Sequence, residues 1–229
     1  MATAIAPELE QNGKAARAAA RILARTSSAV KNQALENIAK ALETDADTIL
    51  AANAADMEAG RASNLSSSLM DRLLLNPDRL KAMADGVRVV VALPDPIGQE
   101  LDSLTRPDGL VVSRRRVPLG VVGVIYESRP NVTVDIAVLC FKSGNPCILR
   151  GGKEAINSNA ALARLIRTAI GDVGGPEGAV QFVEDTDRAL VLQMLGMKEY
   201  IDLLVPRGST ELVNFVGENA SMPAITGGI

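Results

Sequence analysis

Three short segments of this 229-residue sequence combine a turn of small or polar residues with a positively charged side chain. Each segment follows an apolar run suited to a strand and precedes a stretch with helical spacing. The segments and their cations are 125–131 with Arg129, 149–154 with Arg150 and Lys153, and 205–211 with Arg207. Free N–H groups at a helix start bind anions, and a nearby cation strengthens the binding. The segments therefore predict sites for a phosphorylated ligand such as a nucleotide.

Other chemistries are excluded or disfavoured by residue type. The sequence has no histidine, which rules out Ser-His-Asp triads, Cys-His dyads and His-ligated zinc within it. Its two cysteines, Cys140 and Cys147, lie in apolar surroundings with the spacing of neither a metal pair nor a disulfide framework. We expect both to be reduced and buried, and we expect no metal site. Neither a G-x-G-x-x-G fingerprint nor a Walker loop is present, so motifs alone indicate only an anion-binding α/β domain.

The segments need a scaffold, and the first part of the chain predicts helices for it. Residues 1–97 are rich in alanine. Apolar residues recur every fourth position from Val30 to Leu42 behind a cap at Ser27 and Ser28. A further helix is expected from Asn76, with Asn as the cap and Pro77 in the first turn. We assign 1–97 as the N-terminal helical part of the domain that carries the anion-binding segments.

From residue 98 the pattern changes to that of strands. Residues 98–105 and 110–117 flank a Pro-Asp-Gly turn, which predicts a β-hairpin over 98–117. Beyond it, strand-like and helical stretches alternate four times, which predicts a doubly wound parallel sheet over 118–229. The expected strands are 121–125, 147–150, 180–183 and 201–205, and the expected helices are 132–142, 154–170, 187–195 and 210–219. The fold class is therefore α/β.

Bulk properties narrow the partners. The net charge is −3, and two Tyr, three Phe and no Trp leave few platforms on which bases could stack, so we expect no nucleic-acid partner. Apolar runs are far shorter than the roughly 18 residues of a membrane span. The N-terminus lacks the basic start and apolar block of a secretion signal. We therefore expect a cytoplasmic protein with neither a nucleic-acid nor a membrane partner.

Longer stretches of the sequence resemble one enzyme family. Residues 117–135, 142–145, 148–154 and 200–208 closely resemble gamma-glutamyl phosphate reductase, and the N-terminal helices with Asp71-Arg72-Leu73 also fit. That family belongs to the aldehyde dehydrogenase superfamily. The resemblance implies a Rossmann-type fold and, in proline biosynthesis, NADPH-dependent reduction of L-glutamyl 5-phosphate to L-glutamate 5-semialdehyde. A thioacyl-enzyme formed on a cysteine is the expected intermediate.

The resemblance also implies roles for individual residues. The asparagine that stabilises the oxyanion in the superfamily corresponds to Asn131. Ser128 and Arg129 are candidates for contact with the substrate phosphate, although a loop arginine is more often structural. The hairpin 98–117 resembles the superfamily's oligomerisation arm. We expect a homo-oligomer in the full-length form and expect the isolated chain to self-associate through unpaired strand edges.

Cofactor contacts follow in the same way, and they favour NADP. The basic residue that contacts the adenosine ribose or its 2′-phosphate corresponds to Arg150, and Gly151 and Gly152 form the adjoining turn. Lys153 stands where NAD users often carry a ribose-binding glutamate, and a cation there suits the extra phosphate of NADP. Gly208 and Ser209 resemble the turn that meets the pyrophosphate at a helix start. Val213 departs from the glycine that many relatives have.

The resemblance places the nucleophilic cysteine shortly beyond a segment like residues 222–228, whereas the sequence ends at Ile229. We therefore expect a chain without its catalytic domain, which binds cofactor but reduces nothing alone. The alternative is a non-catalytic dinucleotide-binding or interaction module derived from an aldehyde dehydrogenase. A related acyl-phosphate or aldehyde dehydrogenase is a nearer rival, separable by substrate trials.

Overall fold

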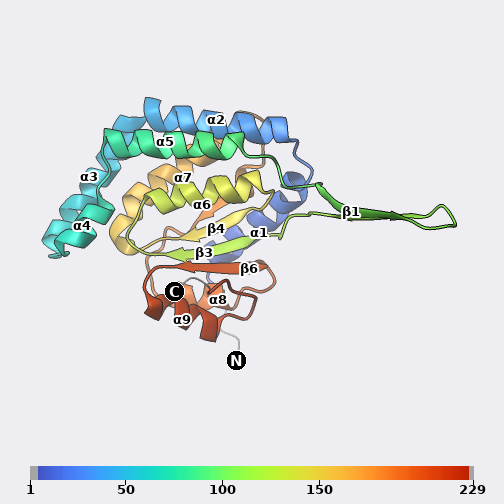
Figure 1. The fold of residues 1–229 in the computed structure, drawn as a ribbon. Helices are drawn as coiled ribbons and strands as arrows, with labels where there is room; N and C mark the ends of the chain where they lie inside the picture. Colours follow the sequence, from blue (N-terminus) through green and yellow to red (C-terminus); the bar gives the residue numbers. More distant parts are fainter. Residues whose placement is uncertain (1–4, 227–229) are drawn as a thin grey trace.

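A computed structural model describes residues 5–226 of the protein (Figure 1). The α-helices are α1 (Pro7–Leu23), α2 (Ser28–Thr44), α3 (Ala46–Ala62), α4 (Ser67–Leu73), α5 (Pro77–Ala92), α6 (Asn131–Lys142), α7 (Ile156–Gly171), α8 (Ala189–Leu195) and α9 (Thr210–Asn219). The strands are β1 (Glu100–Thr105), β2 (Val111–Arg115), β3 (Val122–Tyr126), β4 (Cys147–Arg150), β5 (Val180–Phe182) and β6 (Leu203–Arg207). Short 3₁₀ turns cover Lys153–Ala155 and Glu177–Ala179.

Four of the strands form a parallel sheet in the order β5–β4–β3–β6. The chain runs outward from β3 through β4 to β5 and then returns to the other side of β3 as β6. Helices α6 and α7 cover one face of the sheet, and α2 and α5 pack on these two helices as an outer layer (Figure 1). Helices α1, α8 and α9 pack against the other face (Figure 1). The predicted doubly wound α/β fold is confirmed. Its strand order reverses between β3 and β6.

Alternation along the strands builds a core on each face of the sheet. Val122 and Val124 of β3 pack with the helices of the first face, whereas Ile125 packs with those of the second. In β4, Leu149 faces the first core and Ile148 the second. Consecutive strand residues point to opposite faces, so a sheet covered on both sides needs apolar residues at every position. The short β-branched runs in the sequence meet this requirement.

The predicted helix starts are confirmed by their caps. The Ser27 hydroxyl accepts a hydrogen bond from the Val30 N–H at 3.4 Å. The Asn76 side chain accepts from the Arg79 N–H at 2.8 Å, and Pro77 is the first residue of α5. Each cap satisfies one of the N–H groups that a helix start leaves without a partner. Local sequence therefore sets where α2 and α5 begin.

The predicted hairpin is present and extends away from the body (Figure 1). Strands β1 and β2 pair antiparallel, and the turn closes between the Gly109 N–H and the Arg106 carbonyl at 2.9 Å. Every residue of both strands is exposed. Several are large and apolar, including Leu101, Leu104 and Val112. Within residues 5–226 this two-stranded sheet therefore packs against nothing that would bury its apolar side chains.

Across the part of the chain that the structure describes, none of the helices is both long enough and apolar enough to cross a membrane.

Candidate cofactor and substrate site

The three predicted anion-binding segments meet at one edge of the sheet. In the strand register, Ile125 of β3 lies opposite Arg150 of β4 on one side and Pro206 of β6 on the other. The loops after these strands therefore leave the sheet side by side, with the loop after β3 in the middle. In open parallel sheets, ligands bind beyond the carboxyl ends of strands where the strand order reverses. That place is the crevice between the loops after β3 and β6.

A carboxylate that the sequence did not single out lies in this crevice. Glu127, directly after β3, accepts hydrogen bonds from the Ser209 N–H at 2.9 Å and the Ser209 hydroxyl at 3.1 Å. Its own N–H donates to the Arg207 carbonyl at 3.2 Å. Gly208 leaves room for this contact, since a Cβ there would lie 2.5 Å from Glu127 Oε2. Glu127 thus interacts with the start of α9 as an anionic ligand would.

Gly208 and Ser209 lie where the sequence placed them, at the start of α9. Ser209 is the N-cap, and its hydroxyl accepts from the Leu212 N–H at 3.3 Å. This end of α9 faces the crevice, so it has the geometry for a pyrophosphate. An anion bound at the Ser209 N–H would compete with the Glu127 carboxylate for that donor.

The loop after β4 has a different construction. Arg150 is buried, and its guanidinium donates to the carbonyls of Gly151 at 2.9 Å and Thr186 at 3.1 Å. Its Nε has no partner among the described residues. Burial lowers the pKa of Arg150, and the nearby Glu154 opposes this shift. Arg150 therefore holds the loop together first, and a direct contact with cofactor stays a prediction.

Lys153 is the exposed cation of this loop and opens the 3₁₀ turn before α7. It forms no ion pair with any residue in 5–226. Gly151 and Gly152 are closely packed: a Cβ on Gly151 would collide with the Asn159 amide, and one on Gly152 with the Glu154 carboxylate. The two glycines thus let the loop turn tightly, and Lys153 remains free to meet a phosphate.

Two backbone donors at the start of α7 are already hydrogen-bonded within the protein. The buried Asp56 of α3 accepts from the Ser158 N–H at 2.7 Å and the Asn157 N–H at 3.1 Å. An internal carboxylate therefore already satisfies these donors. The helix expected from 154 begins at Ile156, after a 3₁₀ turn over Lys153–Ala155. The Gly-Gly turn before α7 therefore does not lead to free N–H groups at Asn157 and Ser158, and cofactor contacts by Gly151 and Gly152 stay predictions.

Ser128 is already hydrogen-bonded to another residue of the protein. It adopts a left-handed backbone conformation with φ of 43°. Its N–H and its hydroxyl both donate to Glu154 Oε1, at 2.9 and 2.5 Å. The bond joins the loop after β3 to the loop after β4. Contact between the Ser128 hydroxyl and a substrate would require Glu154 to release it, so this assignment stays a prediction.

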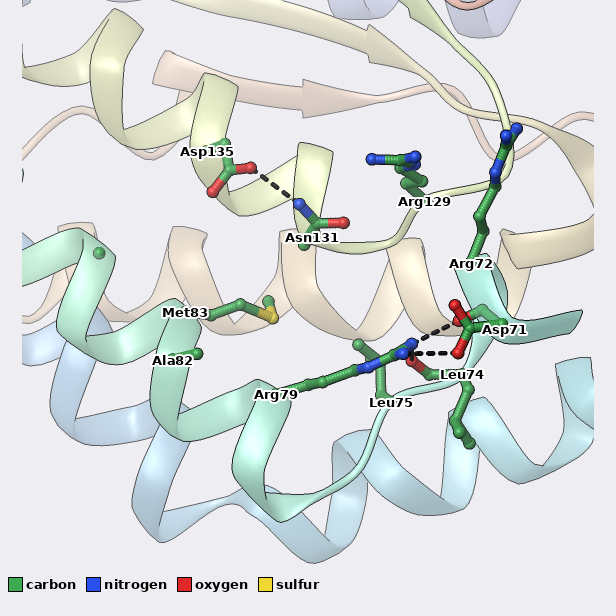
Figure 2. Close-up of a pocket in the computed structure, with 11 residues that line it drawn as sticks. Asp71, Arg72, Leu74, Leu75, Arg79, Ala82, Met83, Arg129, Asn131 and Asp135 are labelled. Atoms are coloured by element: carbon green, nitrogen blue, oxygen red, sulfur yellow. Dashed lines mark hydrogen bonds and ion pairs between the residues drawn. The ribbon is translucent and has the colours of Figure 1, made fainter. Parts of the chain in front are cut away.

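Asn131 opens α6 and lines a cleft of about 400 Å³ between the loop after β3, the end of α4 and the side of α5 (Figure 2). Arg129 lines the same cleft. The Asn131 Nδ2 donates to Asp135 Oδ2 at 2.9 Å, one turn further along α6. Partial burial raises the pKa of the Asp135 carboxyl, and the bond from Asn131 opposes that shift. One amide hydrogen is thus used for orientation, and the other is available to a bound carbonyl oxygen.

This arrangement fits a phosphorylated dinucleotide at the crevice and an acyl group in the cleft. Lys153 is a free cation on one side of the loop after β3, and the start of α9 lies on the other. Asn131 follows the middle loop and faces the cleft. A bound phosphate would meet Lys153, which is unpaired within residues 5–226, and the exposed start of α9, where it would replace the Glu127 carboxylate. The donors at the start of α7 are instead bonded to Asp56, which is buried.

Comparisons with known proteins show the family of this chain. The sequence profile described as the aldehyde dehydrogenase family matches residues 1–226. The chain belongs to the aldehyde dehydrogenase family. Members of this family use a nicotinamide cofactor.

Within that family, the chain is similar to enzymes of one kind. It is 52% identical over 225 residues to the gamma-glutamyl phosphate reductase of Moorella thermoacetica, covering 98% of this chain and 54% of that protein. The crystal structure of gamma-glutamyl phosphate reductase from Thermotoga maritima superposes with a TM-score of 0.95 at 44% identity, over 97% of this chain and 54% of that one. The crystal structure of gamma-glutamyl phosphate reductase from Saccharomyces cerevisiae superposes with a TM-score of 0.87 at 35% identity, over 97% of this chain and 56% of that one. The chain spans about half the length of these relatives.

The cysteines lie away from the cleft and crevice. Cys147 is fully buried, and contact with the Cys140 thiol together with burial raises its pKa well above the usual range. Cys140 is only half-buried against the core, so the expectation that both are fully buried is wrong for this one. It lies on α6 at the edge of the core. The segment that precedes the expected nucleophile runs to Gly228, and its last two residues lie outside the described range.

Proposed function

We propose that this chain supplies the cofactor-binding part of an enzyme that reduces L-glutamyl 5-phosphate to L-glutamate 5-semialdehyde with NADPH. The observation that supports it most is the meeting of Asn131, Lys153 and Ser209 at one edge of the sheet, in a chain that is about half identical to gamma-glutamyl phosphate reductases over nearly its whole length. The substrate is a small molecule, and a cytoplasmic location stays a prediction.

In the proposed reaction, each of a few residues has its own role. NADPH would supply the hydride when bound. Lys153 would hold its 2′-phosphate, and the Ser209 N–H at the start of α9 its pyrophosphate, once Glu127 has moved aside. Asn131 would donate to the acyl oxygen as negative charge develops on it. Asp135 keeps the Asn131 amide oriented through their bond of 2.9 Å.

The same proposal extends to assembly. The exposed edges of β1 and β2 and the apolar side chains on them are what a strand-pairing surface offers. We propose that this hairpin, residues 98–117, pairs with strands of the remainder of the protein or of a second copy. Light scattering over a range of concentrations tests it: a mass that rises with concentration is expected, and a constant monomer mass contradicts it.

Lys153 tests the cofactor assignment. We expect Lys153→Glu to weaken NADPH binding by roughly tenfold or more, because a charge-assisted contact with the 2′-phosphate is replaced by repulsion. NADH, which lacks that phosphate, should bind the variant no worse than it binds the original chain. The measurement is a fluorescence titration of each reduced nucleotide. Lys198→Glu, at an exposed position away from the crevice, is the matched control and should change neither affinity.

Glu127 offers a second and opposite test. We expect Glu127→Gln to raise NADPH affinity several-fold, because the variant removes a negative charge that competes with the pyrophosphate at the start of α9. Glu218→Gln, at the far end of the same helix, is the control. Weaker binding by the Glu127 variant would mean that this carboxylate assists the cofactor and does not compete with it.

A further inference from the structure

The cleft beside Asn131 has a charge pattern that the proposed function does not yet use. Figure 2 shows Arg72 extending from the end of α4 toward the loop that carries Arg129 and leads to Asn131 at the start of α6. All three line the same cleft, although 57 positions or more separate Arg72 from the other two in the sequence. The fold therefore brings two guanidinium groups from different elements to the residue that would polarise the acyl group.

Local acids do not neutralise these two arginines. The third arginine of the cleft, Arg79, is held by the Asp71 carboxylate at 2.7 Å and donates to the Leu74 carbonyl, also at 2.7 Å. Arg79 and Asp71 thus form a wall of the cleft. Arg72 and Arg129, by contrast, make no ion pair and no side-chain hydrogen bond within residues 5–226. Both residues are exposed and line the cleft, so their guanidinium N–H donors are free to bind an anion.

The rest of the cleft suits a short aliphatic acid derivative. Leu75 and Met83 provide an apolar wall opposite Asn131. A carbonyl at the Asn131 amide would place a methylene chain along such a wall and a charged group near the two guanidinium groups. Guanidinium binds carboxylate and phosphate through paired N–H donors, so either anionic group of an acyl phosphate derived from an amino diacid would fit.

We propose that Arg72 and Arg129 form an anion subsite that holds a negatively charged group of the acyl substrate while Asn131 faces its carbonyl. This rests on the proposed function for the identity of the substrate. Arg129 was expected at the substrate phosphate from its sequence context, whereas Arg72 comes from the structure alone. The two arginines together would set the preference for an anionic over a neutral acyl group.

The test is a pair of titrations on the 229-residue chain. Arginine Nε–Hε signals of the ¹⁵N-labelled chain are followed while inorganic phosphate, or separately L-glutamate, is added at constant ionic strength. We expect Arg72→Gln and Arg129→Gln each to raise the dissociation constant about tenfold or more, as the loss of a charge-assisted contact does. Arg25→Gln, an exposed arginine between α1 and α2, should leave it within twofold.

The two ligands separate the sources of the anion. Weaker phosphate binding alone assigns the subsite to the phosphoryl end, weaker glutamate binding alone assigns it to the carboxylate end, and both together assign it to either group. No saturable binding, or equal losses in the Arg25 control, would overturn the subsite. NADPH titration of the same samples keeps the two proposals apart. If NADPH binds normally and the two arginine variants bind the anions as tightly as the original chain, only the subsite is ruled out. If the original chain does not bind NADPH, only the proposed function is ruled out.

Discussion

Asn131→Ala is expected to lower the turnover number for acyl-phosphate reduction by roughly 10²–10³, the usual effect of removing one oxyanion donor. The amide contributes when charge develops on the acyl oxygen, so the Michaelis constant and the affinity for NADPH should change little. The assay is NADPH oxidation with L-glutamyl 5-phosphate. It is made on this chain continued by the residues that follow the matching segment in the Moorella thermoacetica relative.

A neighbouring substitution provides the comparison. Asp135→Asn keeps an oxygen that can accept from the Asn131 amide, so the amide stays oriented while the negative charge is lost. We expect that variant to lose less than tenfold in turnover. If Asn131→Ala lost no more than Asp135→Asn, the amide would not be the oxyanion donor, and the oxygen would have to be stabilised elsewhere.

The parts of this fold that the sequence predicted depend on neighbours in the chain. The cap at Asn76, the turn before Gly109 and the alternating burial along β3 each arise within a few residues. Because such patterns are set by backbone geometry, they can be predicted without knowledge of the tertiary structure. The strand β4 and the helix α9 accordingly have the limits that the sequence predicted.

The site was predicted less completely, because its contacts join residues far apart. Asp56 reaches Ser158 across 102 positions, and Glu127 reaches Ser209 across 82. No spacing rule links such pairs. A carboxylate directly after a strand, as at Glu127, is the one signal that could have drawn attention, since a helix start on the adjacent strand attracts it. For Arg72 the sequence offers no local sign of a role beside Asn131.

Roles, as distinct from positions, came from resemblance and not from spacing. Nothing in the pattern around Lys153 or Asn131 separates a cofactor contact from a solvated side chain. The structure adds that Lys153 is free and that Arg150 is engaged with backbone carbonyls. These two cations, equal in the sequence, are therefore expected to respond differently: loss of Lys153 should affect affinity, and loss of Arg150 should affect the loop first.

The largest effect on stability is expected at the opposite end of β3. Gly120 has φ of +115°, a conformation that L side chains rarely adopt, and a Cβ there would lie 2.6 Å from Asp202 Cγ. The Asp202 carboxylate cannot move easily, because it accepts from the Val121 N–H at 2.7 Å and from Arg17 at 2.6 and 3.0 Å. We expect Gly120→Ala to lower the free energy of unfolding by about 3 kcal/mol or more.

Urea unfolding followed by circular dichroism measures this loss, and Gly86→Ala is its matched control. Gly86 lies in α5, and an added Cβ there meets nothing within 4 Å, so alanine should stabilise the protein by roughly 0.5–1 kcal/mol. Similar effects at both glycines would refute the strain argument. Because Gly120 precedes β3 and the cofactor crevice follows it, the folded fraction of the Gly120 variant should still bind NADPH with unchanged affinity. A Gly120 variant that unfolds readily but binds NADPH normally when folded would show that Gly120 stabilises the sheet and takes no part in cofactor binding.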